Sequence, residues 1–110
     1  MADYNKPKLY QPYILTFGFD VGTTERHRVE FRFNQDIGNL RITVDGRPVI
    51  RRFEMLSFST TRNYEFTVGE VEKHSVLIEK TRERLLGGAR PQKVVVYVDG
   101  EMQGRYGQSW

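Results

Sequence analysis

Apolar and polar residues alternate through most of this chain, and this two-residue period is what most limits its possible folds. It is typical of β-strands with one buried face, because successive side chains of a strand point to opposite sides of the sheet. The best helical candidate, residues 71–86, has no clean 3.6-residue stripe and contains a strand-like run from His74 to Ile78. The pattern therefore predicts an all-β chain with strands at 13–19, 26–34, 39–44, 49–58, 62–68, 73–80, 93–98 and 102–106.

Two predicted hairpins are marked by Val-Asp-Gly, at residues 44–46 and 98–100. Asp-Gly favours a tight two-residue turn, because both turn positions need the positive φ that Gly and Asp tolerate. In the first hairpin, aligning Phe31 with Ile42 makes one face wholly apolar. The same register places Arg32 opposite Arg41, and this like-charged pair either spreads into water or binds an anion.

The two hairpins are copies of one unit. In the first copy, one strand begins at His27 and its partner strand ends at the first Asp-Gly pair. In the second copy, one strand begins at His74 and its partner strand ends at the second Asp-Gly pair. Aligning Val76 with Val98 gives the second copy the same apolar face as the first. We therefore predict an antiparallel β-sandwich of about eight strands, in which two sheets hide these faces against each other.

The overall composition fits a single domain, predicted at 13–107 after a flexible N-terminal segment, 1–12. The chain has 110 residues and no cysteine, which excludes disulfides and thiolate chemistry. Neither a signal-peptide pattern nor an apolar run of membrane-spanning length is present, so we expect a soluble, cytoplasmic protein without a membrane span. The net charge of +3 permits an acidic partner without demanding one.

The two histidines hold equivalent places in the repeat, which invites a functional interpretation. A shared metal or acid–base site would need a carboxylate such as Asp45 or Asp99 beside His27 and His74. The alternative is that each imidazole braces its own Asp-Gly turn by hydrogen bonding. We favour the structural role, because each histidine is explained within its own hairpin. Aspartate before glycine is likewise a common turn preference that needs no catalytic role.

The long connection at residues 81–91 is the most function-like segment, since it exceeds what a hairpin needs. Leu85 and Leu86 either form an exposed tip for a protein partner or fold back over an open end of the sandwich. The candidate partner-binding residues are Arg82, Arg84, Leu85, Leu86 and Arg90. Arg32 and Arg41 are the candidate anion site. Aromatic residues such as Tyr97, Tyr106 and Trp110 suit stacking on nucleic acid, but the charge is too small and too evenly mixed to favour it.

Several segments follow one another in a distinctive order. They are the strand from His27, Gly38, the first Val-Asp-Gly, residues 50–53, the run from Tyr64 to Gly69, and the second Val-Asp-Gly with Tyr106. This order, over residues 26–106, resembles the Fas apoptotic inhibitory molecule family. The resemblance implies a non-catalytic β-sandwich that binds proteins and is associated with restraint of death-receptor signalling and with stress protection. Longer members carry two such domains, and this chain has room for one.

We therefore expect a non-enzymatic protein-interaction module that uses no cofactor or metal. The alternative from another class is a small hydrolytic or metal-using enzyme centred on His27 and His74. A third is a weak nucleic-acid binder. The oligomeric state stays open.

Overall fold

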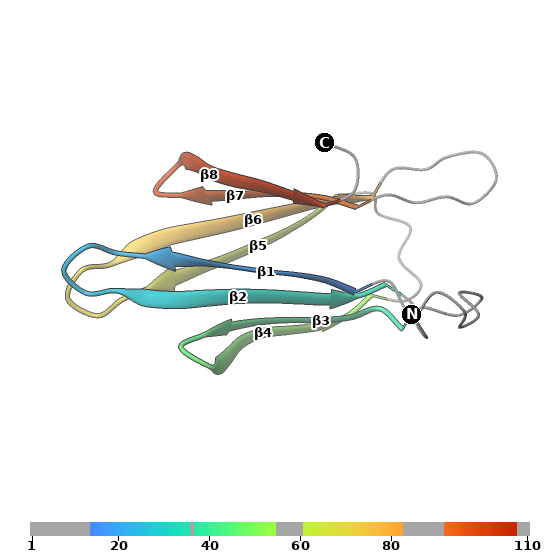
Figure 1. The fold of residues 1–110 in the computed structure, drawn as a ribbon, viewed down its shortest axis with the longest axis horizontal. Helices are drawn as coiled ribbons and strands as arrows, with labels where there is room; N and C mark the ends of the chain where they lie inside the picture. Colours follow the sequence, from blue (N-terminus) through green and yellow to red (C-terminus); the bar gives the residue numbers. More distant parts are fainter. Residues whose placement is uncertain (1–13, 36, 55–60, 83–91, 108–110) are drawn as a thin grey trace, which may run out of the picture.

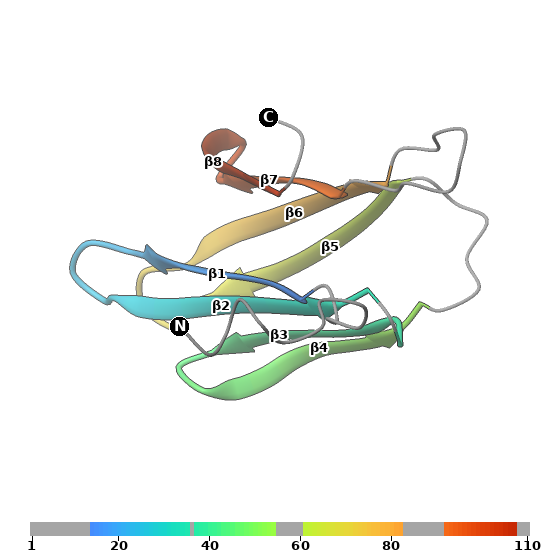
Figure 2. The ribbon, with the colours of Figure 1, turned by 45° about the vertical axis from the view of Figure 1, so that its right-hand side comes forward.

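The computed structural model describes residues 14–35, 37–54, 61–82 and 92–107. These residues form two four-stranded antiparallel sheets, in the orders β1-β2-β3-β4 and β5-β6-β7-β8. Figures 1 and 2 show the sheets as two layers, which confirms the predicted all-β sandwich. The strands are β1 (Ile14–Val21), β2 (His27–Asn34), β3 (Asn39–Val44), β4 (Arg47–Phe53), β5 (Thr61–Val68), β6 (His74–Arg82), β7 (Gln92–Val98) and β8 (Glu101–Gly107).

Both predicted hairpin registers are confirmed. In the first sheet Phe31 pairs with Ile42, and in the second Val76 pairs with Val98. Asp45 and Gly46 have φ angles of 51° and 82°, and the second Asp-Gly has nearly the same values, as a two-residue type I′ turn requires. The repeat inferred from the sequence is therefore a repeat of backbone conformation.

The strand that follows each Asp-Gly turn differs from the prediction. β4 begins at Arg47, before the predicted start at 49, and it ends at Phe53. The register shifts between Ile42 and Thr43, and it shifts at the equivalent place in the β7–β8 pair. A bulge of this kind changes which face the following residues occupy, because strand side chains alternate. The prediction for 55–58 lies outside the described residues, as does the N-terminal segment 1–12.

An apolar core fills the space between the sheets, and aromatic stacking closes it on one side. The Phe17 ring of β1 lies 4.8 Å from Phe31 and 3.8 Å from Tyr106 of β8. This contact joins the edge strands of two different sheets. The buried apolar residues are Val21, Val29, Phe31, Phe33, Leu40, Ile42, Ile50, Tyr64, Val68, Val76, Ile78, Val94 and Val96.

The core also contains a buried ion pair. The Lys80 ammonium lies 3.1 Å from the Glu54 carboxylate, and the two side chains are only 6% and 5% exposed. The Tyr64 hydroxyl donates to the same carboxylate at 2.7 Å, and Lys80 lies 4.0 Å from the centre of the Phe33 ring. Burial lowers the pKa of Lys80 and raises that of Tyr64. The buried Lys80 ammonium and Glu54 carboxylate therefore each depend on the opposite charge to offset the loss of water.

Among the described residues there is no helix with the length and apolar character needed to cross a membrane.

Candidate functional site

His27, at the start of β2, lies between two carboxylates. Its Nδ1 is 2.5 Å from Asp45, and its Nε2 is 2.6 Å from Glu25. Asp45 also accepts the Arg28 backbone N–H at 2.8 Å. The imidazole thus connects the Asp-Gly turn after β3 to the loop before β2, and the predicted bracing of that turn is present.

His74, at the start of β6, repeats the arrangement. Its Nδ1 is 2.6 Å from Asp99, and its Nε2 is 2.5 Å from Glu72. Asp99 accepts the Ser75 backbone N–H at 2.8 Å. The near-identity of the two sets of distances shows that this geometry belongs to the repeated unit.

Glu25 and Glu72 connect the two sheets to each other. The Glu25 carboxylate accepts three backbone N–H groups from the turn before β6, at 2.7 to 2.9 Å. The Glu72 carboxylate accepts three from the turn before β2, at 2.7 to 3.0 Å. We call this reciprocal pair of carboxylates and turns the carboxylate clasp. The donors are Glu70, Val71 and Glu72 on one side and Thr23, Thr24 and Glu25 on the other.

Two glycines make the tight turns of the clasp possible. Gly22 and Gly69 both have a φ of +100°. A Cβ on Gly22 would overlap the carbonyl oxygen of Glu25, and one on Gly69 would overlap that of Glu72. Glycine is therefore required at both places for conformation and for space.

The clasp strongly perturbs the acidity of its members. Backbone N–H donation, first from Glu72 and then from Glu70, lowers the pKa of Glu25 to about 2. The pKa of Glu72 is lowered by the same cause, with the Glu25 N–H first. Hydrogen bonding to Asp45 and then to Glu25 raises the pKa of His27. Each carboxylate is therefore held ionised beside an imidazole whose protonated form is favoured.

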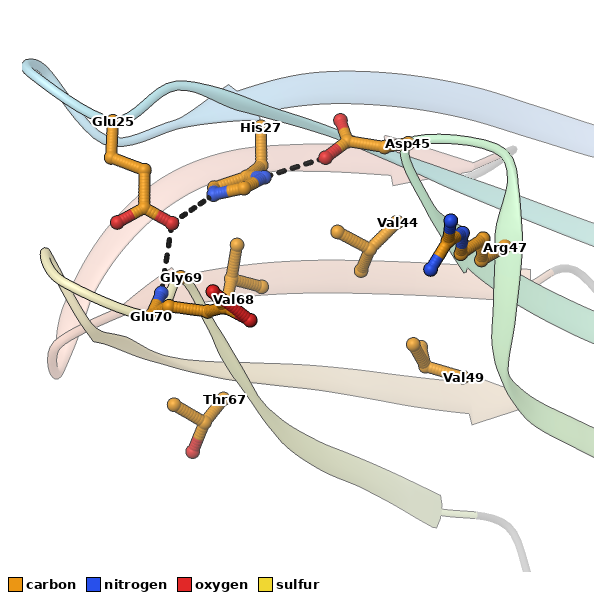
Figure 3. A pocket seen from close by; sticks show the side chains of 10 residues that line it. All are labelled: Glu25, His27, Val44, Asp45, Arg47, Val49, Thr67, Val68, Gly69 and Glu70. Atoms are coloured by element: carbon orange, nitrogen blue, oxygen red, sulfur yellow. Dashed lines mark hydrogen bonds and ion pairs between the residues drawn. The ribbon is translucent and has the colours of Figure 1, made fainter.

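An open pocket of about 480 Å³ lies beside His27, between the β3–β4 hairpin and the end of β5. Figure 3 shows the His27 ring between Glu25 and Asp45 at one wall of this pocket, with Val44, Val49 and Val68 among the other side chains that line it. Its charged lining residues are Glu25, His27, Asp45, Arg47 and Glu70, and its apolar ones include Val44, Val49 and Val68.

The histidines in this geometry present no free ring nitrogen to the pocket. Each imidazole uses both nitrogens in hydrogen bonds to carboxylates. A metal would need a lone pair on one of them, and a general base would need an unprotonated nitrogen within reach of substrate. Within the described ranges, no group of three or more His, Asp or Glu side chains is arranged to hold a metal ion. The network is best explained as a structural connection between turns.

The outer face of the first sheet carries the second candidate site. Arg32 on β2 pairs with Arg41 on β3, as predicted, and Arg41 pairs in turn with Arg51 on β4. All three side chains are exposed, and none has a hydrogen-bond or ion-pair partner among the described residues. We call these three residues the arginine row. Neighbouring strands lie about 4.8 Å apart, so the row presents three guanidinium groups across roughly 10 Å of sheet.

The second sheet provides an internal comparison for this row. The equivalent residues there are Asn63, Glu79, Val95 and Arg105, which pair across β5 to β8. Only Arg51 has an arginine at the matching place, Arg105. The glycine, glutamate, histidine and aspartate of the clasp network are the same in both copies, whereas the arginine row is not. Duplicated residues are explained by the fold, so the row needs another explanation.

The predicted partner-binding residues fall in two classes. Arg82 is the last residue of β6 and is partly buried. The other members of that set are Arg84, Leu85, Leu86 and Arg90, which lie outside the described residues.

Neither the carboxylate clasp nor the third arginine of the row is among the residues predicted from the sequence. Gly-x-x-Glu-x-His occurs at residues 22–27 and again at 69–74, so extending the repeat before each histidine would have found Glu25 and Glu72. Arg51 joins the row only through the bulge in the β3–β4 pair. No local pattern marks that bulge.

No protein-family model matches the chain, and no curated protein sequence matches it.

Proposed function

We propose that this chain is a non-enzymatic binding module that holds an acidic protein partner on the outer face of its first sheet. The observation that carries the proposal is the arginine row, three exposed arginines aligned across β2, β3 and β4 without partners among the described residues. Placing like charges directly opposite each other weakens a sheet. An anionic ligand bound across the row would remove this repulsion, which gives the row a physical reason to bind acidic groups.

The row suits carboxylates on a protein better than a nucleic-acid backbone. Arginine binds a carboxylate in a planar, bidentate manner. Glu30 lies two residues from Arg32 on the same exposed face of β2, and it would repel a continuous line of phosphates. The net charge of +3 is also small for a nucleic-acid surface. An extended peptide places alternate side chains about 7 Å apart, so two acidic residues can meet the row together.

The resemblance to the Fas apoptotic inhibitory molecule family supports a role through binding rather than catalysis. On this proposal the module regulates its partner by occupying an acidic segment. A part in apoptosis or stress protection is the form of regulation that the resemblance suggests.

The test uses a fluorescein-labelled decaglutamate peptide and fluorescence anisotropy at low salt. Wild type should bind the peptide, and Arg51→Glu should bind at least tenfold more weakly because it places a negative charge within the row. Arg105→Glu is the matched control: it makes the same charge change at the equivalent position of the second sheet. It should bind like wild type.

Two outcomes would overturn the proposal. One is equal loss of binding in both variants, which would show only a response to net charge. The other is tighter binding of an oligothymidylate of the same length, with steep salt dependence, which would assign the row to nucleic acid.

A further inference from the structure

A second surface, on the outer face of the second sheet, has the opposite chemistry to the arginine row. A shallow pocket of about 340 Å³ lies there, lined by Glu65, Ser75, Leu77, Glu79, Tyr97 and Gly100. Leu77 on β6 pairs with Glu65 on β5 and with Tyr97 on β7. The pocket therefore has an apolar floor with a carboxylate on one side and an aromatic ring on the other.

The carboxylates of this pocket are unpaired within the part of the chain that the structure describes. Glu65 is exposed and Glu79 is partly buried, two residues from Leu77 on the same face of β6. An arginine side chain matches this set closely. Its stem packs on an apolar floor, its guanidinium binds carboxylates, and an aromatic face attracts its charge.

We propose that the arginine row of one copy of this chain docks into the Glu65–Glu79 pocket of a second copy. The inference rests on the proposed function, since it names the partner of the same row. Charge complementarity supports it: the row has three arginines without described partners, and the pocket has two carboxylates without described partners. The two surfaces lie on the outer faces of different sheets, so a chain cannot satisfy its own row.

The contact is head-to-tail, because it joins two different surfaces. A contact of this kind leaves one free row and one free pocket at the ends, so further copies can add. Lys93 and Arg105 also face outward from β7 and β8, which confines the acidic part of the face to β5 and β6. The contact is therefore small, and small interfaces give weak association. We expect reversible assembly that grows with concentration.

Sedimentation velocity of the full chain, from about 10 µM to about 1 mM, tests this because weak interfaces associate in that range. Wild type should shift to larger species as concentration rises. Arg41→Glu destroys the row and keeps the pocket, and Glu79→Arg does the reverse. Each variant alone should associate at least tenfold more weakly. In an equimolar mixture, the intact row of Glu79→Arg should dock into the intact pocket of Arg41→Glu. Assembly should stop at this heterodimer, because neither copy then offers a second intact surface.

Circular dichroism tests whether each variant is folded. If either variant of the first pair is unfolded, Arg51→Glu and Glu65→Arg replace them. A wild type that stays monomeric throughout would overturn the inference. Self-association of the single variants to the same extent as wild type would also overturn it. A mixture of the two variants that forms no heterodimer would do the same. If wild type is monomeric but still binds decaglutamate through the row, the self-association fails and the proposed function stands.

Discussion

Replacing Lys80 with methionine should strongly destabilise the protein. Methionine keeps an unbranched, apolar stem of similar size and removes the charge. Glu54 would then remain 5% exposed without its counter-ion, with the Tyr64 hydroxyl as its remaining described donor. Removing one member of a buried pair costs about 3 to 5 kcal/mol, because the other charge stays desolvated. Domains of this kind have a free energy of unfolding of about 5 to 15 kcal/mol, so the loss is a large fraction.

The double variant Glu54→Gln/Lys80→Met should recover part of this loss. Glutamine keeps an acceptor for Tyr64, and no buried charge remains. We expect an interaction energy of about 2 kcal/mol between the two sites, within the range measured for residues in direct contact. The first sheet shows that an uncharged arrangement fits this core, because Phe33 occupies the place in β2 that Lys80 holds in β6.

Urea denaturation followed by circular dichroism measures these differences from the midpoint and slope of each transition. Lys73→Met is the control, since Lys73 is exposed and has no described partner, and its stability should stay within about 0.5 kcal/mol of wild type. If Lys80→Met is as stable as the control, or the double variant is less stable than Lys80→Met alone, the buried charge of Glu54 does not need Lys80.

Stability should be greatest between about pH 4.5 and 6.5. Because folding lowers the pKa of Glu25 to about 2, protonation of this carboxylate removes stability as pH falls from 4.5 toward 2. Because folding raises the pKa of His27, loss of the imidazole proton removes stability as pH rises above 6.5. A urea midpoint that still climbs from pH 7 to 9 would contradict this. Gly69→Ala should lower the thermal midpoint far more than Gly100→Ala, because both have positive φ but only the first adds a Cβ that overlaps backbone; equal shifts would count against the steric argument. Ile42→Ala should cost about 2 to 5 kcal/mol in urea denaturation, as for other fully buried isoleucines, and a change under about 1 kcal/mol would show that the core relaxes around the lost atoms.

Much of the fold follows from short-range pattern. Alternation along β2 and β3 identifies their buried faces, and aligning those faces determines the register from Val29–Val44 to Phe33–Leu40. The Asp-Gly pairs determine the turns, because few residue types accept positive φ at both positions. The same register places Arg32 opposite Arg41. It also identified the repeat, and with it the structural role of His27 and His74 within their hairpins.

The remaining features depend on contacts between residues far apart in the chain. Glu25 and the turn before β6 are separated by some 45 residues, and neither has a local period that announces the other. Lys80 occupies an inward-facing position where alternation predicts an apolar side chain, and only the facing Glu54 makes its burial possible. Arg51 lies opposite Arg41 because of a bulge in the β3–β4 pair, and this bulge depends on the packing of the whole hairpin. Strands, turns and the register of the two central hairpins can therefore be predicted from neighbours along the chain, whereas which charges meet and which stay open to a partner depends on contacts between distant segments.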